Sequence, residues 1–253
     1  MRCFSKVSVR GRARALTCAL ALALTLTGHG TARAAGAEPA AAGAVEHLSI
    51  DARSAGESLP HFWETMFGSG RAVLALRANY QRDLATMRSA TAIGYVRFHG
   101  VLDDHVGLVA APTALFYDKP SAAKSLYNFS YIDQIYDALR AQGVRPLVEL
   151  DFMPRALAAD PDMLQGFWYH PNISPPGDYA AWDGVIRALA RHLIARYGID
   201  EVSQWYFEVW NEPNLDFWGG APRQQSYFKL YDHTARDLKR VSPRLRVGGP
   251  ATA

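Results

Sequence analysis

One short stretch of the chain combines groups that could do acid–base chemistry with aromatic rings that could contact a ligand. Residues 205–218 read Trp-Tyr-Phe-Glu-Val-Trp-Asn-Glu-Pro-Asn-Leu-Asp-Phe-Trp. The first six, 205–210, are mostly aromatic or β-branched, which predicts a strand, and Pro213 ends it because proline has no N–H to donate. Asn211 and Glu212 are then expected at the carboxyl end of that strand, where barrels of alternating strands and helices place their catalytic groups.

A carboxyl group among aromatic rings is typical of one kind of chemistry. Aromatic rings pack well against sugar rings, and a neutral carboxylic acid can protonate a glycosidic oxygen. Glu212 is therefore the candidate general acid, Phe217 and Trp218 are candidate walls of a sugar site, and the proline-bounded loop 167–176 is a further candidate wall. A core strand that simply ends in a turn would have no need of an Asn-Glu pair.

Hydrolysis of a glycosidic bond needs a second carboxyl group, about 5–5.5 Å from the first in retaining enzymes and about 6.5–9.5 Å in inverting ones. Glu208 shares the predicted strand with Glu212, but four extended residues would separate the two by about 13 Å. We therefore expect Glu208 to pair with a basic group in the core. Glu149, near the end of the neighbouring predicted strand, is the best internal candidate, although a buried glutamate that orients other site residues is the more common case.

A histidine and an arginine end another predicted strand. Arg97 and His99 are two residues apart, so their side chains point to the same face. Asp103, Asp104 and His105 follow closely, and together with His99 they could form a metal cluster. A metal-dependent hydrolase, which a chelator would inactivate, is therefore kept as a minor alternative. Hydrolysis by two carboxyl groups needs no metal or other cofactor.

The elements that must position these residues alternate along the chain. A first strand and loop are predicted at 62–68, further strands at 93–99, 146–150 and 205–210, and the start of a fifth strand at 245–248. Helices are predicted at 76–88, 131–141, 179–197 and 227–241. Strands separated by helices predict parallel βαβ units, and hence an α/β fold of the (β/α)8 TIM-barrel type. A whole barrel needs eight strands and about 250 residues of its own. We therefore expect about the first four to five β/α units, an incomplete barrel.

Motifs in a fixed order support this architecture. They are Gly68-Ser-Gly-Arg-Ala72, Tyr95-Val-Arg-Phe-His-Gly100, Asp103-Asp-His-Val-Gly107, Tyr127-Asn-Phe-Ser-Tyr131, Arg145-Pro-Leu-Val-Glu149, Phe152-Met-Pro154, Phe207-Glu-Val-Trp-Asn-Glu-Pro-Asn-Leu215 and Val247-Gly-Gly-Pro250. The series closely resembles glycoside hydrolase family 39, the family of β-xylosidases and α-iduronidases, and in particular its β-xylosidase branch. The resemblance implies that residues 45–253 are the N-terminal portion of the catalytic barrel.

The resemblance also implies a role for each matching residue. Glu212 matches the general acid/base, and Asn211 matches the residue that hydrogen-bonds the sugar hydroxyl next to the reacting carbon. His99 matches a sugar-hydroxyl ligand, and Arg97 matches a support for the carboxylates, a role that we also expect of Glu149. The family takes its nucleophile from a glutamate on the seventh strand, so the nucleophile is expected outside this chain.

These observations predict a secreted retaining glycoside hydrolase, most like a β-1,4-xylosidase acting on xylo-oligosaccharides. An α-L-iduronidase-like specificity is less favoured, because the chain shows no obvious basic site for a uronate carboxylate. The alternative from another class is a catalytically incomplete fragment with at most weak sugar binding. Circular dichroism melting and xylose titration would separate that fragment from an enzyme.

The N-terminal residues indicate export. Residues 1–34 have a basic start, an apolar run at 15–26 and a small-x-small cleavage site at 32–34, as in a secretory signal peptide. Residues 35–44 are rich in Ala, Gly and Pro and are predicted to be a disordered linker. We expect a secreted or periplasmic protein that is free of the membrane after signal cleavage.

The charge balance changes once the signal peptide is removed. The whole chain has 27 basic and 24 acidic residues, a net charge of +3. Residues 1–34 hold six of the basic residues and no acidic ones, so 21 basic residues remain against 24 acidic ones, a net charge of −3. This gives no reason to expect nucleic acid as a partner. The predicted partner is an oligosaccharide, and the sequence leaves the oligomeric state open.

Overall fold

The computed structural model describes residues 49, 51, 55–109 and 127–253. The chain divides into two units, Met1–Gly56 and Glu57–Ala253, and the helices and strands of the described residues all lie in the second unit. The predicted signal peptide (1–34) and linker (35–44) lie outside the described residues, so both stay predictions.

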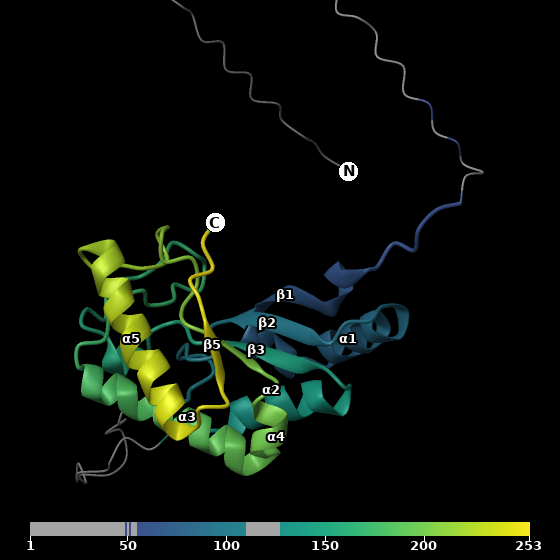
Figure 1. The fold of residues 1–253 in the computed structure, drawn as a ribbon. Coiled ribbons are helices and arrows are strands. Elements are labelled where there is room, and N and C mark those ends of the chain that lie inside the picture. The colour runs from purple at the N-terminus through teal and green to yellow at the C-terminus, as the bar shows by residue number, and fades with distance from the viewer. Residues whose placement is uncertain (1–48, 50, 52–54, 110–126) are drawn as a thin grey trace, which may run out of the picture. The chain divides into compact units, whose positions relative to one another are not determined.

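A five-stranded parallel sheet forms the centre of the second unit (Figure 1). Its strands are β1 (Met66–Arg71), β2 (Tyr95–His99), β3 (Arg145–Glu149), β4 (Tyr206–Glu208) and β5 (Arg246–Gly248). Their order in the sheet is their order in the chain, β1-β2-β3-β4-β5. Sequential parallel strands joined by helices are the arrangement of a (β/α) barrel, so the predicted fold class is confirmed.

Helices connect successive strands of the sheet. They are α1 (Ala78–Ala90), α2 (Ser130–Ala141), α3 (Tyr179–Tyr197), α4 (Ile199–Val202) and α5 (Arg223–Val241), with short 3-10 turns η1 (Phe62–Thr65), η2 (Ala72–Leu76) and η3 (Arg155–Leu157). Within the described residues, no helix is long and apolar enough to cross a membrane.

The two faces of the sheet carry different side chains because successive strand residues point in opposite directions. Along β2, Val96 and Phe98 are buried, whereas Tyr95, Arg97 and His99 are only partly buried. The apolar face belongs to one buried cluster that includes residues of α2 and α3, namely Ile132, Ile135, Leu139, Ile186, Leu189 and Leu193. The opposite face is left for polar side chains, and the site is built there.

Helix α3 has the predicted bounds, and local signals explain them. The Asp178 side chain accepts a hydrogen bond from the backbone N–H of Ala180 at 2.8 Å, which caps the first turn. Gly198 ends the helix with a φ of 80°, a conformation that glycine adopts without the steric cost that other residues incur. Short helix α4 follows directly and was not predicted.

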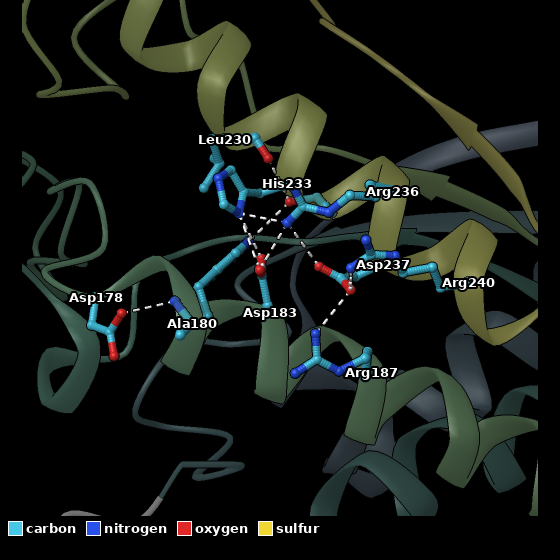
Figure 2. A network of polar contacts seen from close by, with 11 residues as sticks. Asp178, Ala180, Asp183, Arg187, Leu230, His233, Arg236, Asp237 and Arg240 are labelled. Carbon is cyan, nitrogen blue, oxygen red and sulfur yellow. Dashed lines mark hydrogen bonds and ion pairs between the residues drawn. The ribbon is translucent and has the colours of Figure 1, made fainter.

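Helix α3 is joined to α5 by a polar network on the outside of the fold (Figure 2). Asp183 of α3 lies 2.9 Å from Nδ1 of His233 and 2.8 Å from Nη2 of Arg236, both on α5. Asp237 of α5 lies 2.8 Å from Nη1 of Arg187 on α3. A carboxylate of each helix therefore meets an arginine of the other.

Strand β4 is shorter than predicted. The pattern predicts a strand over 205–210, whereas the observed strand covers Tyr206–Glu208. The extended conformation is lost at Trp210, whose φ is 68°. The segment that carries Asn211 and Glu212 is therefore a turn that follows the strand, rather than the strand's own last residues.

Candidate active site

Three charged side chains meet at the carboxyl ends of β2, β3 and β4. The register pairs Glu149 of β3 with Glu208 of β4, and it pairs Arg97 of β2 with Leu147, two residues before Glu149. Arg97 thus starts lower in the sheet than the two glutamates, and its long side chain extends toward them. All three belong to the polar face of the sheet.

Arg97 connects these groups. Its Nε lies 2.6 Å from Oε2 of Glu208, its Nη1 lies 2.9 Å from Oε2 of Glu149, and its Nη2 donates to Oδ1 of Asn211 at 2.9 Å. A planar guanidinium with several donors can hold three acceptors in fixed directions. Glu208 is paired with a basic group, as expected, and the contacts of Arg97 are those of a residue that supports carboxylates.

The turn after β4 has an unusual backbone. Trp210 and Glu212 have φ values of 68° and 39°, and positive φ is uncommon for residues other than glycine. Such conformations persist where the surrounding structure enforces them, which is often at functional sites. The separation of about 13 Å expected between Glu208 and Glu212 assumed an extended chain, and that assumption is wrong. The ion pair of Glu208 with Arg97 is the better argument against a catalytic role for Glu208.

Asn211 and Glu212 are adjacent groups that a ligand could use. Asn211 is 2% exposed, and Arg97 fixes its amide orientation by donating to Oδ1. Its Nδ2 has no hydrogen-bond partner in the described part of the chain, and the side chain of the half-buried Glu212 has no hydrogen bond or ion pair there either. The turn thus offers one amide donor and one carboxyl group side by side.

Two buried carboxyl groups, those of Glu149 and Asp151, lie close to His99. Oε1 of the fully buried Glu149 is 2.8 Å from Nδ1 of His99, and the fully buried Asp151 accepts a hydrogen bond from the backbone N–H of Gly100 at 2.6 Å. Burial raises the pKa of Glu149 to about 8, and burial together with the charge of Glu149 raises the pKa of Asp151 well above its ordinary value. Arg97 opposes the shift of Glu149, but burial outweighs it, so the two carboxyl groups retain a proton between them at neutral pH.

Asp151 is a site residue that the sequence did not reveal. It follows Glu149 by two residues at the carboxyl end of β3, the same spacing that relates Arg97 to His99. That spacing was the available signal. Its contacts with Gly100 and Glu149 depend on the packing of β2 beside β3, which the sequence does not display.

The side chains that could share a metal ion differ from the cluster that the sequence analysis kept as a minor alternative. Within the described residues, His99, Glu149 and Asp151 have ligand atoms that all lie within 4.8 Å of one another. His105 is instead 2.6 Å from Asp103, through Nδ1 and Oδ1. Nδ1 of His99 and Oε1 of Glu149 already share a hydrogen bond, so the geometry is that of a proton-sharing group as much as of a metal site.

The aromatic residues that follow the turn pack against other rings. Phe217 is partly buried and lies 5.4 Å, ring to ring, from Phe167 of the predicted wall loop. Its backbone oxygen accepts a hydrogen bond from the Trp210 indole at 2.7 Å. Trp218 is 1% exposed and packs against Trp210 at 4.9 Å, so its ring is covered by other side chains. Contact between Trp218 and a sugar stays a prediction, and its burial argues for a packing role.

The chain resembles several known proteins. The family model of glycosyl hydrolases family 39 matches residues 46–253. A β-xylosidase of Geobacillus stearothermophilus is 44% identical over 190 residues, which are 75% of this chain and 36% of that protein. An α-L-iduronidase of Mus musculus is 32% identical over 161 residues, 63% of this chain and 22% of that protein.

Solved structures show the same likeness in three dimensions. The crystal structure of a monomeric β-xylosidase from Caulobacter crescentus matches with a TM-score of 0.69 and 41% identity, over 80% of this chain and 39% of that one. The present chain spans a little over a third of the length of the β-xylosidases it matches.

Proposed function

The chain belongs to glycosyl hydrolases family 39, and from that membership we propose that the full-length protein is a retaining glycosidase, a β-1,4-xylosidase acting on xylo-oligosaccharides. The observation that carries the proposal is the Asn211–Glu212 turn, which presents an oriented amide and an unpaired carboxyl group beside the Arg97 cluster. The 44% identity to a β-xylosidase supports the choice of sugar.

Glu212 acts as the general acid/base in this proposal. It donates its proton to the glycosidic oxygen as the bond to the anomeric carbon breaks, and the leaving sugar departs as an alcohol. A nucleophilic carboxylate meanwhile forms a covalent glycosyl-enzyme. Glu212, now ionised, takes a proton from the water that attacks this intermediate, which restores both carboxyl groups to their starting states.

Asn211 and His99 bind the sugar in the proposed complex. The amide Nδ2 of Asn211 donates to a hydroxyl next to the reacting carbon, a contact that strengthens in the transition state. His99 is held by Glu149 through Nδ1, so its Nε2 is left for a second hydroxyl. Arg97 keeps Asn211 in place from below.

The nucleophile needs a carboxylate about 5–5.5 Å from Glu212. Glu208 is bound to Arg97, and Glu149 is bound to both Arg97 and His99, so neither is free to attack a sugar. We propose that a glutamate outside residues 57–253 supplies the nucleophile in the full-length protein. From the family resemblance, we expect it on the seventh strand of the barrel.

The test replaces Glu212 in the full-length protein and measures hydrolysis of an aryl β-xyloside. Removing a general acid/base lowers the rate about 10²- to 10⁴-fold, and the loss should be smaller for an aryl group that leaves without protonation. Azide should restore turnover of Glu212→Ala on that substrate by attacking the glycosyl-enzyme. Asp232→Ala, an exposed carboxyl change on α5, is the matched control. Failure of azide rescue would contradict the acid/base role.

Two other results of these measurements would favour an alternative function. Turnover of an aryl α-L-iduronide in preference to the xyloside would favour the iduronidase-like specificity, to which the 32% identity with an α-L-iduronidase gives some support. A full-length protein that melts cooperatively but turns over neither glycoside would favour weak sugar binding without catalysis.

We also propose that the protein is exported, on the basis of the signal-peptide pattern at 1–34. The measurement is expression of the complete gene product in a bacterial host, followed by N-terminal sequencing of material from outside the cytoplasm. A mature N-terminus at Ala35 is expected. Full-length protein retained in the cytoplasm would contradict export.

A further inference from the structure

Arg71 ends β1 at the same edge of the sheet as the candidate site. The register pairs Gly68 with Arg97 and then Arg71 with His99, so β1 advances by three residues where β2 advances by two. This extra residue is a β-bulge, a feature that redirects the following side chain. Gly70, with a φ of 42°, takes the left-handed conformation that the bulge requires. The bulge thus brings Arg71 beside His99.

Two aromatic rings hold the guanidinium of Arg71. Its central carbon lies 4.2 Å from the ring centroid of Tyr169 and 4.7 Å from that of Trp168. These distances are typical of cation–π contacts, and arginine is the usual cation in them. The two rings meet edge to face at 5.6 Å, so the guanidinium lies in the corner between them. Arg71 is therefore held in place without using its hydrogen-bond donors.

One of those donors is buried and has no acceptor. Within the described residues, four buried side-chain atoms lack a hydrogen-bond partner, and Nη1 of Arg71 is the one donor among them. The glutamates at the ends of β3 and β4, Glu149 and Glu208, are already bound to Arg97. A buried donor left unpaired is costly to the protein. Such a group is explained if a ligand supplies the acceptor.

The position of Arg71 is continuous with the proposed sugar site. On one side it is paired in register with His99. On the other, its partner Tyr169 stacks on Phe167 at 5.5 Å, and Phe167 lies 5.4 Å from Phe217. This aromatic wall therefore runs from Arg71 to the segment that follows Glu212.

We propose that Arg71 is a substrate-binding residue whose Nη1 donates a hydrogen bond to a hydroxyl oxygen of the sugar held beside His99. The inference rests on the proposed glycosidase function and adds a specificity-determining contact to it. This role explains the motif Gly68-Ser-Gly-Arg-Ala72, because Gly70 takes the left-handed conformation at the bulge that positions the arginine.

A neutral hydroxyl fits this position better than a carboxylate. Burial raises the pKa of Tyr169, and the charges of Asp151, Asp103 and Glu149 raise it further, while Arg71 opposes them. Three acidic side chains are thus within electrostatic reach of the ring that holds Arg71. A uronate would add a further negative charge to this group, and like charges destabilise one another at close range. A hydroxyl completes the hydrogen bond without that repulsion.

The test compares Arg71→Met with the wild type in the full-length protein. The KM for an aryl β-xyloside should rise about 10- to 100-fold, the loss expected for a hydrogen bond to a charged donor. The melting temperature should stay unchanged or rise, because methionine keeps the apolar contact with the two rings and removes the unpaired donor. Arg82→Met, an exposed change on α1, is the matched control and should alter neither quantity.

Two other outcomes would overturn the assignment of Arg71 as a residue that binds a sugar hydroxyl. A lower melting temperature with an unchanged KM would show that Arg71 only braces the aromatic corner. An increase in KM for an aryl β-glucuronide but not for the xyloside would assign Arg71 to a carboxylate instead.

Failure of the proposed function is detected separately, because the wild type would then turn over no glycoside. In that case xylose should still raise the melting temperature of the wild type more than that of Arg71→Met. Equal shifts in the two proteins would overturn the proposal.

Discussion

Two polar networks in this protein both pair carboxyl groups with arginines, but the ratio of carboxyl groups to cations is opposite in the two. At the carboxyl ends of the strands, one arginine, Arg97, pairs with both Glu149 and Glu208. Between α3 and α5, two carboxylates face a larger set of cations (Figure 2). These contacts join Asp183 to His233 and Arg236, and Asp237 to Arg187, Arg236 and Arg240.

The proportion of charges decides what each network can do. In the network at the strand ends, the inner network, carboxyl groups outnumber cations, and burial raises the pKa of Glu149 to about 8. In the network between α3 and α5, the outer network, burial alone would raise the pKa of Asp237, but hydrogen bonds from Arg187 and Arg236 lower it instead. Arg187 and Arg236 therefore favour the ionised form of Asp237, which helps to join the two helices, whereas the inner network keeps a proton and leaves hydrogen-bonding groups for a ligand.

The largest expected difference concerns the arginine of each network. Arg97→Met should lower the free energy of unfolding by about 3–5 kcal/mol, because it leaves buried carboxyl groups without their cation. Arg187→Met should cost about 1 kcal/mol or less, because Arg187 is a third exposed and Asp237 keeps other partners. Urea unfolding of the full-length protein at pH 7 measures both changes. Equal losses would contradict the contrast between the networks.

The second-largest expected difference between the networks is in how stability depends on pH. A carboxyl group with a raised pKa stabilises the fold at low pH, and this stabilisation is lost as the pH rises through the folded-state value. The inner network should therefore weaken the fold between about pH 5 and pH 8, by at most about 1.4 kcal/mol per pH unit for one proton. Glu149→Gln should flatten this limb of the stability curve.

The contribution of the outer network to stability depends on pH in the opposite direction. Asp237 has a lowered pKa, so its stabilisation is present at neutral pH and is lost as the pH falls below the ordinary range of an aspartate. Asp237→Asn should flatten the acid limb and leave the limb above pH 5 unchanged. Urea unfolding at a series of pH values measures both limbs. If Glu149→Gln changed only the acid limb, the inner carboxyl pair would not hold the proton assigned to it.

The smallest effect should come from the edge of the outer network. Arg240 is 64% exposed and lies 3.5 Å from Asp237. Arg240→Ala should change the free energy of unfolding by less than about 0.5 kcal/mol, because exposed ion pairs contribute little and Asp237 retains Arg187 and Arg236. Thermal unfolding in low and in high salt provides the measurement. A loss above about 1 kcal/mol would show that the cations of this network are not redundant.

The sequence alone predicted the order of strands and helices and the fold class. Local chemistry explains this success, since helix α3 begins at a capping aspartate and ends at a glycine, and β2 alternates between its two faces. Signals of this kind need no knowledge of distant contacts. The bounds of β4 were less accurate because a positive φ at Trp210 interrupts a strand-like pattern.

Tertiary structure alone decided which of these residues touch. Arg97 and Glu208 are 111 positions apart in the chain, and only the register of β2, β3 and β4 brings them within 2.6 Å. The same packing buries Trp218, places Asp151 against Glu149, and leaves Arg71 with a buried donor that has no acceptor among the described residues. Burial and pairing are properties of neighbours in space, and a strand pattern specifies a side chain's face without specifying what stands opposite it.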